Sequence, residues 1–127
     1  MNTNIKISLA VVAAAALGAA AMQELHAQTK RKAYSITEVE LIDAAVQAAY
    51  GPIQQAAVKA AGGRGLGTGG GRIIASVGTA PKRVVINEWD SFEQAVSFFD
   101  SKAYKDLAPQ REKAAKTIRR YVVETVN

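Results

Sequence analysis

The stretch RVVINEWDSFEQAVSFF, residues 83–99, decides the fold because it places a strand directly before a capped helix. Its first seven residues are rich in β-branched side chains that alternate between two faces, which is the pattern of a strand. Ser91, with Gln94 three residues later, fits the capping box that begins a helix. Apolar side chains then recur at helical spacing as far as Phe99.

The chain before this stretch predicts another strand and another helix. Lys32 to Leu41 alternates and is rich in β-branched residues, so we expect a strand. Asp43 is expected to cap a helix whose apolar stripe runs to Ala60-Ala61. Gly51-Pro52 interrupts that stripe, and we expect the helix to kink or restart there because proline removes a backbone donor.

The chain after this stretch predicts short helices and a last strand. Ser101 is expected to cap a helical piece that holds Tyr104. Pro109 interrupts the path, and a short helix is expected to follow in QREKAAKT, residues 110–117. Ile118 to Val126 is again typical of a strand.

A glycine-rich segment, GGRGLGTGGGR at residues 62–72, lies between the first helix and the stretch at 83–99. It contains a G-x-G-x-x-G match, but a phosphate loop needs a strand before it and a helix after it, and here the order is reversed. We predict instead a hairpin, with strands at Arg64–Thr68 and Arg72–Val77 and a turn at Gly69–Gly71. Gly65 and Gly67 then leave space where side chains would otherwise stand.

The predicted order is strand, helix, strand, strand, helix, strand. This order predicts an α+β protein with a ferredoxin-like split β-α-β sandwich, in which a four-stranded antiparallel sheet carries its helices on one face. The other face needs a cover, and a chain of this size without disulfides has only a modest core. We therefore expect a homodimer in which two sheets pack face to face and form an α+β barrel.

Residues 1–27 are predicted to be a secretory signal peptide. The segment carries Lys6 near its start, runs apolar from Ile7 to Met22 and ends on the small residue Ala27, as such peptides do. Cleavage after Ala21 and an uncleaved membrane anchor are the alternatives, although the apolar run is short for a span. We expect a periplasmic or secreted protein with one domain at 28–127 and no stable membrane anchor after cleavage.

The residue types that remain after cleavage exclude several kinds of chemistry. The chain has no cysteine, and its one histidine, His26, lies in the predicted signal peptide. This composition excludes Ser-His-Asp and Cys-His triads, ordinary zinc sites and haem held through His or Cys. No cofactor motif or metal-ligand spacing is present, so we expect neither. The net charge is +5, but the basic residues are not interleaved with aromatic ones, so we expect no nucleic-acid partner.

Glu88 is the first candidate for a functional residue. It alternates with Val84 and Ile86, so its carboxylate lies on an apolar strand face, where burial raises a pKa unless a cation pairs with it. Arg111 or Arg83 is the expected cation. A structural Glu–Arg pair between strand and helix is the alternative reading.

Aromatic side chains complete the candidate pocket. Tyr34, Tyr104 and Trp89 are expected to line it and to orient a small aromatic or acyl ligand through their polar tips. Residues with this spacing also serve as core or dimer contacts, and that alternative remains open.

The quoted strands and helices resemble a known family. KAYSITEVE, AAGGRGLGTGGG, KRVVINEWDSFEQAVSFFDSKAYKDLAPQREKAA and IRRYVVE look like the domain of unknown function 1330 family, from about Lys32 to Val126. That family belongs to the dimeric α+β barrel superfamily, so the resemblance implies a dimer of ferredoxin-like units. It implies no activity. The chain departs from the family where Gly65-Leu66-Gly67 replaces a bulkier strand.

Two classes of function follow from these features. The first is an exported dimer that binds a small molecule or a partner without chemistry. The second is a small cofactor-free enzyme, an isomerase or a monooxygenase-like catalyst, that uses Glu88 as acid or base near Tyr104. Enzymatic activity is therefore an open question at this stage, and an open pocket around Glu88 would favour it.

Overall fold

A computed structural model describes residues 31–127, and the predicted signal peptide at 1–27 lies outside the described residues. This part of the chain contains both strands and helices. They follow in the order β1 (Ala33–Leu41), α2 (Ala44–Ala60), β2 (Arg64–Gly65), β3 (Arg83–Trp89), α3 (Phe92–Asp100), α4 (Lys102–Lys105), α5 (Ala108–Ala114) and β4 (Ala115–Glu124).

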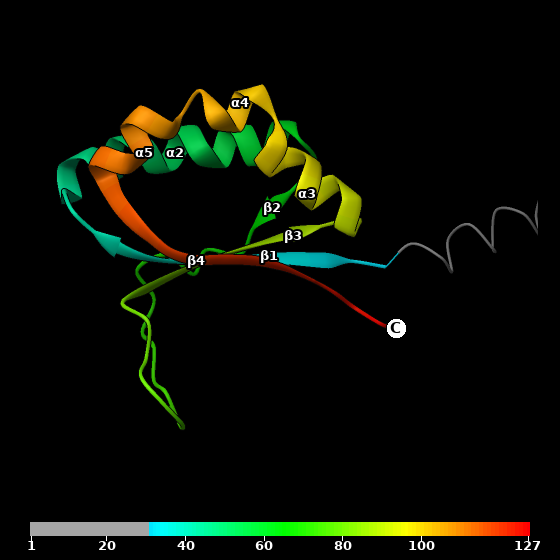
Figure 1. Ribbon diagram of the computed structural model, residues 1–127, viewed down its shortest axis with the longest axis horizontal. Coiled ribbons are helices and arrows are strands. Elements are labelled where there is room, and N and C mark those ends of the chain that lie inside the picture. Colours follow the sequence, from blue (N-terminus) through cyan, green and yellow to red (C-terminus); the bar gives the residue numbers. More distant parts are fainter. Residues whose placement is uncertain (1–30) are drawn as a thin grey trace, which may run out of the picture. The chain divides into compact units, whose positions relative to one another are not determined.

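The strands form one four-stranded antiparallel sheet in the order β2-β3-β1-β4. All the labelled helices lie on one face of this sheet (Figure 1). The α+β class and the antiparallel sheet are confirmed. In the register, Ser35 lies opposite Asn87 and Val122, while its neighbour Tyr34 lies opposite Glu88 and Val123. Ser35, Asn87 and Val122 face the helices, and Tyr34, Glu88 and Val123 face away from them.

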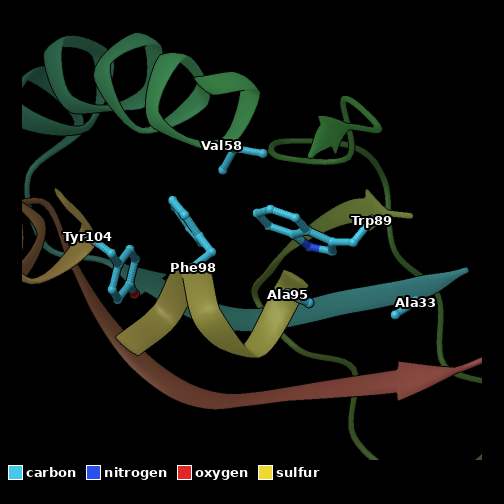
Figure 2. Packing of buried hydrophobic residues seen from close by; sticks show 6 residues of the cluster. All are labelled: Ala33, Val58, Trp89, Ala95, Phe98 and Tyr104. Atoms are coloured by element: carbon cyan, nitrogen blue, oxygen red, sulfur yellow. The ribbon is translucent and has the colours of Figure 1, made fainter. Parts of the chain in front are cut away.

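The core lies between the sheet and the helices. Trp89 of β3, Val58 of α2 and Phe98 of α3 converge there, with Tyr104 of α4 beside them (Figure 2). The Trp89 and Phe98 ring centroids are 5.1 Å apart, and those of Phe98 and Tyr104 are 5.2 Å apart. The Trp89 indole donates a 2.9 Å hydrogen bond to the hydroxyl of Ser35, and both residues are fully buried.

The predicted helix starts are confirmed. The Asp43 carboxylate accepts hydrogen bonds from the first turn of α2, at 3.0 Å from Ala45 N and 3.1 Å from Val46 N. Ser91 caps α3 and Ser101 caps α4 through their hydroxyls. These caps satisfy amides that have no partner within their own helix.

The predicted hairpin is wrong. Only Arg64 and Gly65 form a strand, and they pair with β3 rather than with Arg72–Val77, which is not a strand. Beyond these two residues, the Thr68 side chain takes the place of a paired strand at the edge of β3. Its hydroxyl donates to Val84 O at 2.8 Å and accepts from Ile86 N at 3.0 Å. The chain then leaves the sheet as a long loop on the side away from the helices (Figure 1).

Three elements also differ from the expectation. α5 begins at Ala108, holds Pro109 in its first turn and ends at Ala114, whereas the sequence predicted an interruption at Pro109 and a helix over residues 110–117. α2 runs through Pro52 as one helix and does not restart there. Packing of α2 against α5, β2 and α4 accompanies this continuous helix despite the loss of one backbone donor. β4 begins at Ala115 rather than at Ile118, because an irregularity between Glu38 and Val39 lets β1 and β4 stay paired to Leu41.

Candidate functional site

The six candidate residues do not form one pocket. Glu88 and Tyr34 lie together on the sheet face away from the helices. Tyr104 and Arg111 lie together among the helices, and Trp89 is in the core. Arg83 lies at the β2 edge of the sheet, against the glycine-rich segment.

Glu88 is surrounded by donors. Its Oε1 lies 2.6 Å from Arg64 Nη2 and 3.1 Å from Lys32 Nζ, and the Tyr34 hydroxyl donates to its Oε2 at 3.1 Å. The Arg64 hydrogen bonds, followed by that of Lys32, lower the pKa of Glu88 from 4.5 to about 2. Glu88 is therefore a permanently ionised partner at neutral pH.

The expectation that Arg111 or Arg83 pairs with Glu88 is wrong. Arg111 is on the opposite face of the sheet, and Arg83 points to the helix side. Sequence reasoning missed Arg64 because it assigned Arg64 to a hairpin with Arg72–Val77. The signal lay in the register: once β2 pairs with β3, Arg64 stands directly opposite Glu88.

A second ion pair lies on the same sheet face. Arg119 Nε donates to Glu38 Oε2 at 2.7 Å and Arg119 Nη2 donates to Oε1 at 2.9 Å, so the pair is bidentate. The hydrogen bonds from Arg119 hold the pKa of Glu38 below its usual value. Between the two ion pairs the face is apolar. We call this surface the open sheet face, and its apolar residues are Tyr34, Ile36, Val84, Ile86, Tyr121 and Val123.

The second group of candidates forms a cationic pocket. Arg111 lies with its guanidinium carbon 4.0 Å from the centre of the Tyr104 ring and donates to Tyr104 O at 3.1 Å. Arg120 donates to the Tyr104 hydroxyl and lies 4.3 Å from the centre of the Phe99 ring. Arg120 is a residue that the sequence did not single out.

A cavity of about 460 Å³ opens beside these arginines, between α5 and the start of β4. We call it the α5–β4 pocket. Arg111, Arg120, Lys116 and Thr117 line it, and Glu112 is its one acidic residue. Within residues 31–127, neither Arg111 nor Arg120 forms an ion pair. Two guanidinium groups held on an aromatic ring therefore keep donors free for an anion.

A buried hydroxyl lies near the same cluster. The Tyr50 side chain of α2 is buried, and its hydroxyl has no hydrogen-bond partner among residues 31–127. Burial raises the pKa of Tyr50, against the opposing effect of Arg111. Tyr50 therefore stays neutral at pH 7, and it does not line the α5–β4 pocket.

Two further features are absent from the described part of the chain. Over residues 31–127, no helix is long and apolar enough to cross a membrane. In the same range, no three acidic, histidine or cysteine side chains are grouped as a metal site would require.

Comparisons with known proteins agree with this fold. A family model described as "Domain of unknown function (DUF1330)" matches residues 32–126. The RPA0582 protein of Rhodopseudomonas palustris, a structural genomics target of unknown function, aligns with a TM-score of 0.53 and 20% identity, over 82% of this chain and 93% of that one. Methylated RPA0582 protein aligns with a TM-score of 0.55 and 19% identity, over 82% and 91% of the chains. At such identities the likeness shows the fold alone. No curated protein matches the sequence.

Proposed function

This chain belongs to the DUF1330 family, and we propose that it is an exported homodimer that binds a small carboxylate-bearing molecule without transforming it. The binding site in this proposal is the α5–β4 pocket. The observation that carries it is the pair of arginines, Arg111 and Arg120, fixed on Tyr104 beside that pocket.

The ligand class follows from the charges that line the pocket. Arg111, Arg120 and Lys116 outnumber Glu112, so the pocket favours an anion. Planar guanidinium groups match the two oxygens of a carboxylate. Phe99 and Tyr104 lie edge to face, 5.0 Å apart, and the Arg120 guanidinium packs against both rings. The rings hold the guanidinium groups in place, while Ile42 and Ala115 add apolar surface to the pocket itself, so an aromatic or acyl acid fits it.

The environment of Glu88 supports the part of the proposal that the ligand is bound without being transformed. An acid or base that works near neutral pH needs a pKa close to the working pH, whereas the pKa of Glu88 is about 2. Its oxygens are occupied by Arg64, Lys32 and Tyr34. The enzymatic alternative, in which Glu88 moves a proton near Tyr104, has no support in this geometry because the two residues lie on opposite faces of the sheet.

The dimer is supported by the open sheet face. Tyr121 and Val123 of β4 are each about half exposed there, at 48% and 46%. The strand order β2-β3-β1-β4 supports the ferredoxin-like arrangement, and with it the packing of two such sheets into an α+β barrel. A second copy would also bring its own Glu38–Arg119 and Glu88–Arg64 pairs, so the charged margins of the two faces are self-complementary.

Native mass spectrometry of the protein purified from the exported fraction tests this proposal. We expect the mass of a dimer that starts at Gln28 and carries an extra small acid. A variant with Arg111→Gln and Arg120→Gln should lose the adduct and remain a dimer. Lys113→Gln is the matched control, since Lys113 is exposed on α5 and does not line the pocket.

Two outcomes would contradict the proposal. A bare dimer that also fails to bind benzoate in calorimetry would remove the binding function. An adduct that survives in the double arginine variant would place the ligand elsewhere in the molecule.

A further inference from the structure

A second cavity lies on the helix side of the sheet, between α2 and the glycine-rich segment after β2. Its volume is about 290 Å³, and we call it the glycine pocket. Gln47 and Gln54 line it from α2, Gly67 and Gly69 line it from the opposite wall, and Arg83 reaches it from the first position of β3. It shares no lining residue with the α5–β4 pocket.

The wall opposite α2 consists mostly of glycines, with Thr68 as its one residue that carries a side chain. Gly67 has a φ of +69°, which favours glycine, and a Cβ there would meet nothing within 4 Å. A Cβ on Gly69 would lie 3.1 Å from Arg83 Nη2, so a larger residue would press on the guanidinium. The glycines thus keep the cavity open and let Arg83 lie against the backbone.

Arg83 has no ionic partner within residues 31–127. Its Nε is buried and has no hydrogen-bond partner in the part of the chain that the structure describes. An unsatisfied buried donor is unfavourable, and the penalty is larger on a charged group. A negatively charged group in the glycine pocket would remove this penalty, because Arg83 is the cation that lines it.

We propose that the glycine pocket binds the carboxylate of a small monoanion, with Arg83 as its charge partner. One cation matches one negative charge, whereas a phosphate dianion would leave a charge uncompensated. The amides of Gln47 and Gln54 offer donors and acceptors for a polar substituent on the same molecule. A volume of about 290 Å³ is near the lower limit of ligand pockets, so the occupant is a small hydroxy- or amino-acid-sized molecule.

Fluorine NMR with 3,3,3-trifluorolactate, a fluorinated hydroxy acid, as the carboxylate probe tests this site. The parent for the experiment is the exported chain carrying Arg111→Gln and Arg120→Gln, which silences the α5–β4 pocket. We expect saturable line broadening of the probe, and Arg83→Gln should weaken its binding by about tenfold, the loss of one charge-assisted contact. Arg72→Gln is the matched control, since Arg72 lies in the same glycine-rich segment but does not line the cavity.

A second variant guards against a change in fold. Gln54→Leu keeps Arg83 and a similar side-chain size. It should weaken the binding of the probe severalfold, because it removes one of the two amides proposed to bind the polar substituent. Absence of saturable broadening in the parent, or equal binding by the parent, the Arg83→Gln variant and the Gln54→Leu variant, would overturn the proposal. The site is independent of the proposed function, because both arginines of the α5–β4 pocket are already absent from the parent.

Discussion

Arg64 Nη2 lies 2.6 Å from Glu88 Oε1 and 3.0 Å from Asp90 Oδ1, so one side chain ties the edge strand β2 to the end of β3. β2 has only two residues, and its backbone pairing alone is weak support for an edge. The guanidinium adds directional hydrogen bonds at the point where the glycine-rich segment begins. This geometry favours a structural pair for Glu88, although it joins two strands and not a strand and a helix as the sequence suggested.

The first prediction concerns acid stability. The pKa of Glu88 is lowered from 4.5 to about 2 in the folded protein. The unfolded chain therefore binds more protons than the folded protein between these pH values. The contribution of the pair to the free energy of unfolding is complete above about pH 4.5 and is lost as the pH falls to about 2. We expect Glu88→Gln to lower the free energy of unfolding at pH 7 and to flatten its fall below pH 4.5, as measured by urea denaturation.

Glu124→Gln is the control for this measurement, since Glu124 is exposed and forms no ion pair within residues 31–127. Glu38, whose pKa is also lowered, remains in both variants and gives a common background. If the free energy of unfolding falls with pH below 4.5 equally in the Glu88→Gln variant and in the unmodified protein, Glu88 contributes nothing to this fall.

The second prediction concerns the buried hydrogen bond between Trp89 and Ser35. The indole donates to the Ser35 hydroxyl at 2.9 Å, and neither residue is exposed to water. Ser35→Ala leaves the indole N–H without a partner, so we expect a loss of about 1–3 kcal/mol in the free energy of unfolding. Chemical denaturation followed by Trp89 fluorescence measures it. Ser76→Ala, at an exposed loop position, should change stability by less than about 0.5 kcal/mol.

The sequence predicted what depends on neighbouring residues. Ser91, Ser101 and Asp43 cap helices through amides two or three positions away, so the local sequence is enough to predict their role. The strand at Arg83–Trp89 was predicted with its exact bounds because its alternation is self-contained. The same holds for the assignment of Glu88 to an apolar strand face.

Features that depend on pairing between residues far apart in the sequence could not be predicted in this way. Arg64 and Glu88 are 24 positions apart and meet only after β2 has joined β3. Thr68 occupies the edge of β3 with its hydroxyl, which no strand propensity encodes. Arg120 was overlooked because its role depends on α4, whose Tyr104 it contacts across 16 positions.

The third prediction concerns export, which follows from residues 1–27. Cell fractionation followed by N-terminal sequencing should find the mature chain outside the cytoplasm, starting at Gln28. Replacing apolar residues of the run from Ile7 to Met22 by charged ones should keep the full-length chain inside. A mature chain that keeps Met1 and stays with the membrane would instead favour the uncleaved anchor.

The fourth prediction concerns the open sheet face. Tyr121→Glu places a charge where the proposed second copy packs, and desolvating an unpaired charge in an interface is strongly unfavourable. We expect a dimer in the unmodified protein and a monomer in this variant by analytical ultracentrifugation. Ile53→Glu is the matched control, since Ile53 is 44% exposed on α2, on the other side of the sheet. A monomeric unmodified protein, or a Tyr121→Glu variant that stays dimeric, would contradict the proposed interface.

The last prediction concerns the loop between β2 and β3, which extends beyond the open sheet face, away from the helices (Figure 1). Ile74 and Val77 in this loop are 94% and 92% exposed. A second copy seated on the open sheet face would lie beside this loop and cover these side chains, which removes apolar surface from water. Replacing both by serine should weaken the dimer about tenfold, while urea denaturation of the monomeric Tyr121→Glu background should show no loss of stability. Equal dissociation constants with and without the serines would show that the loop does not hold the partner, even if the sheets do.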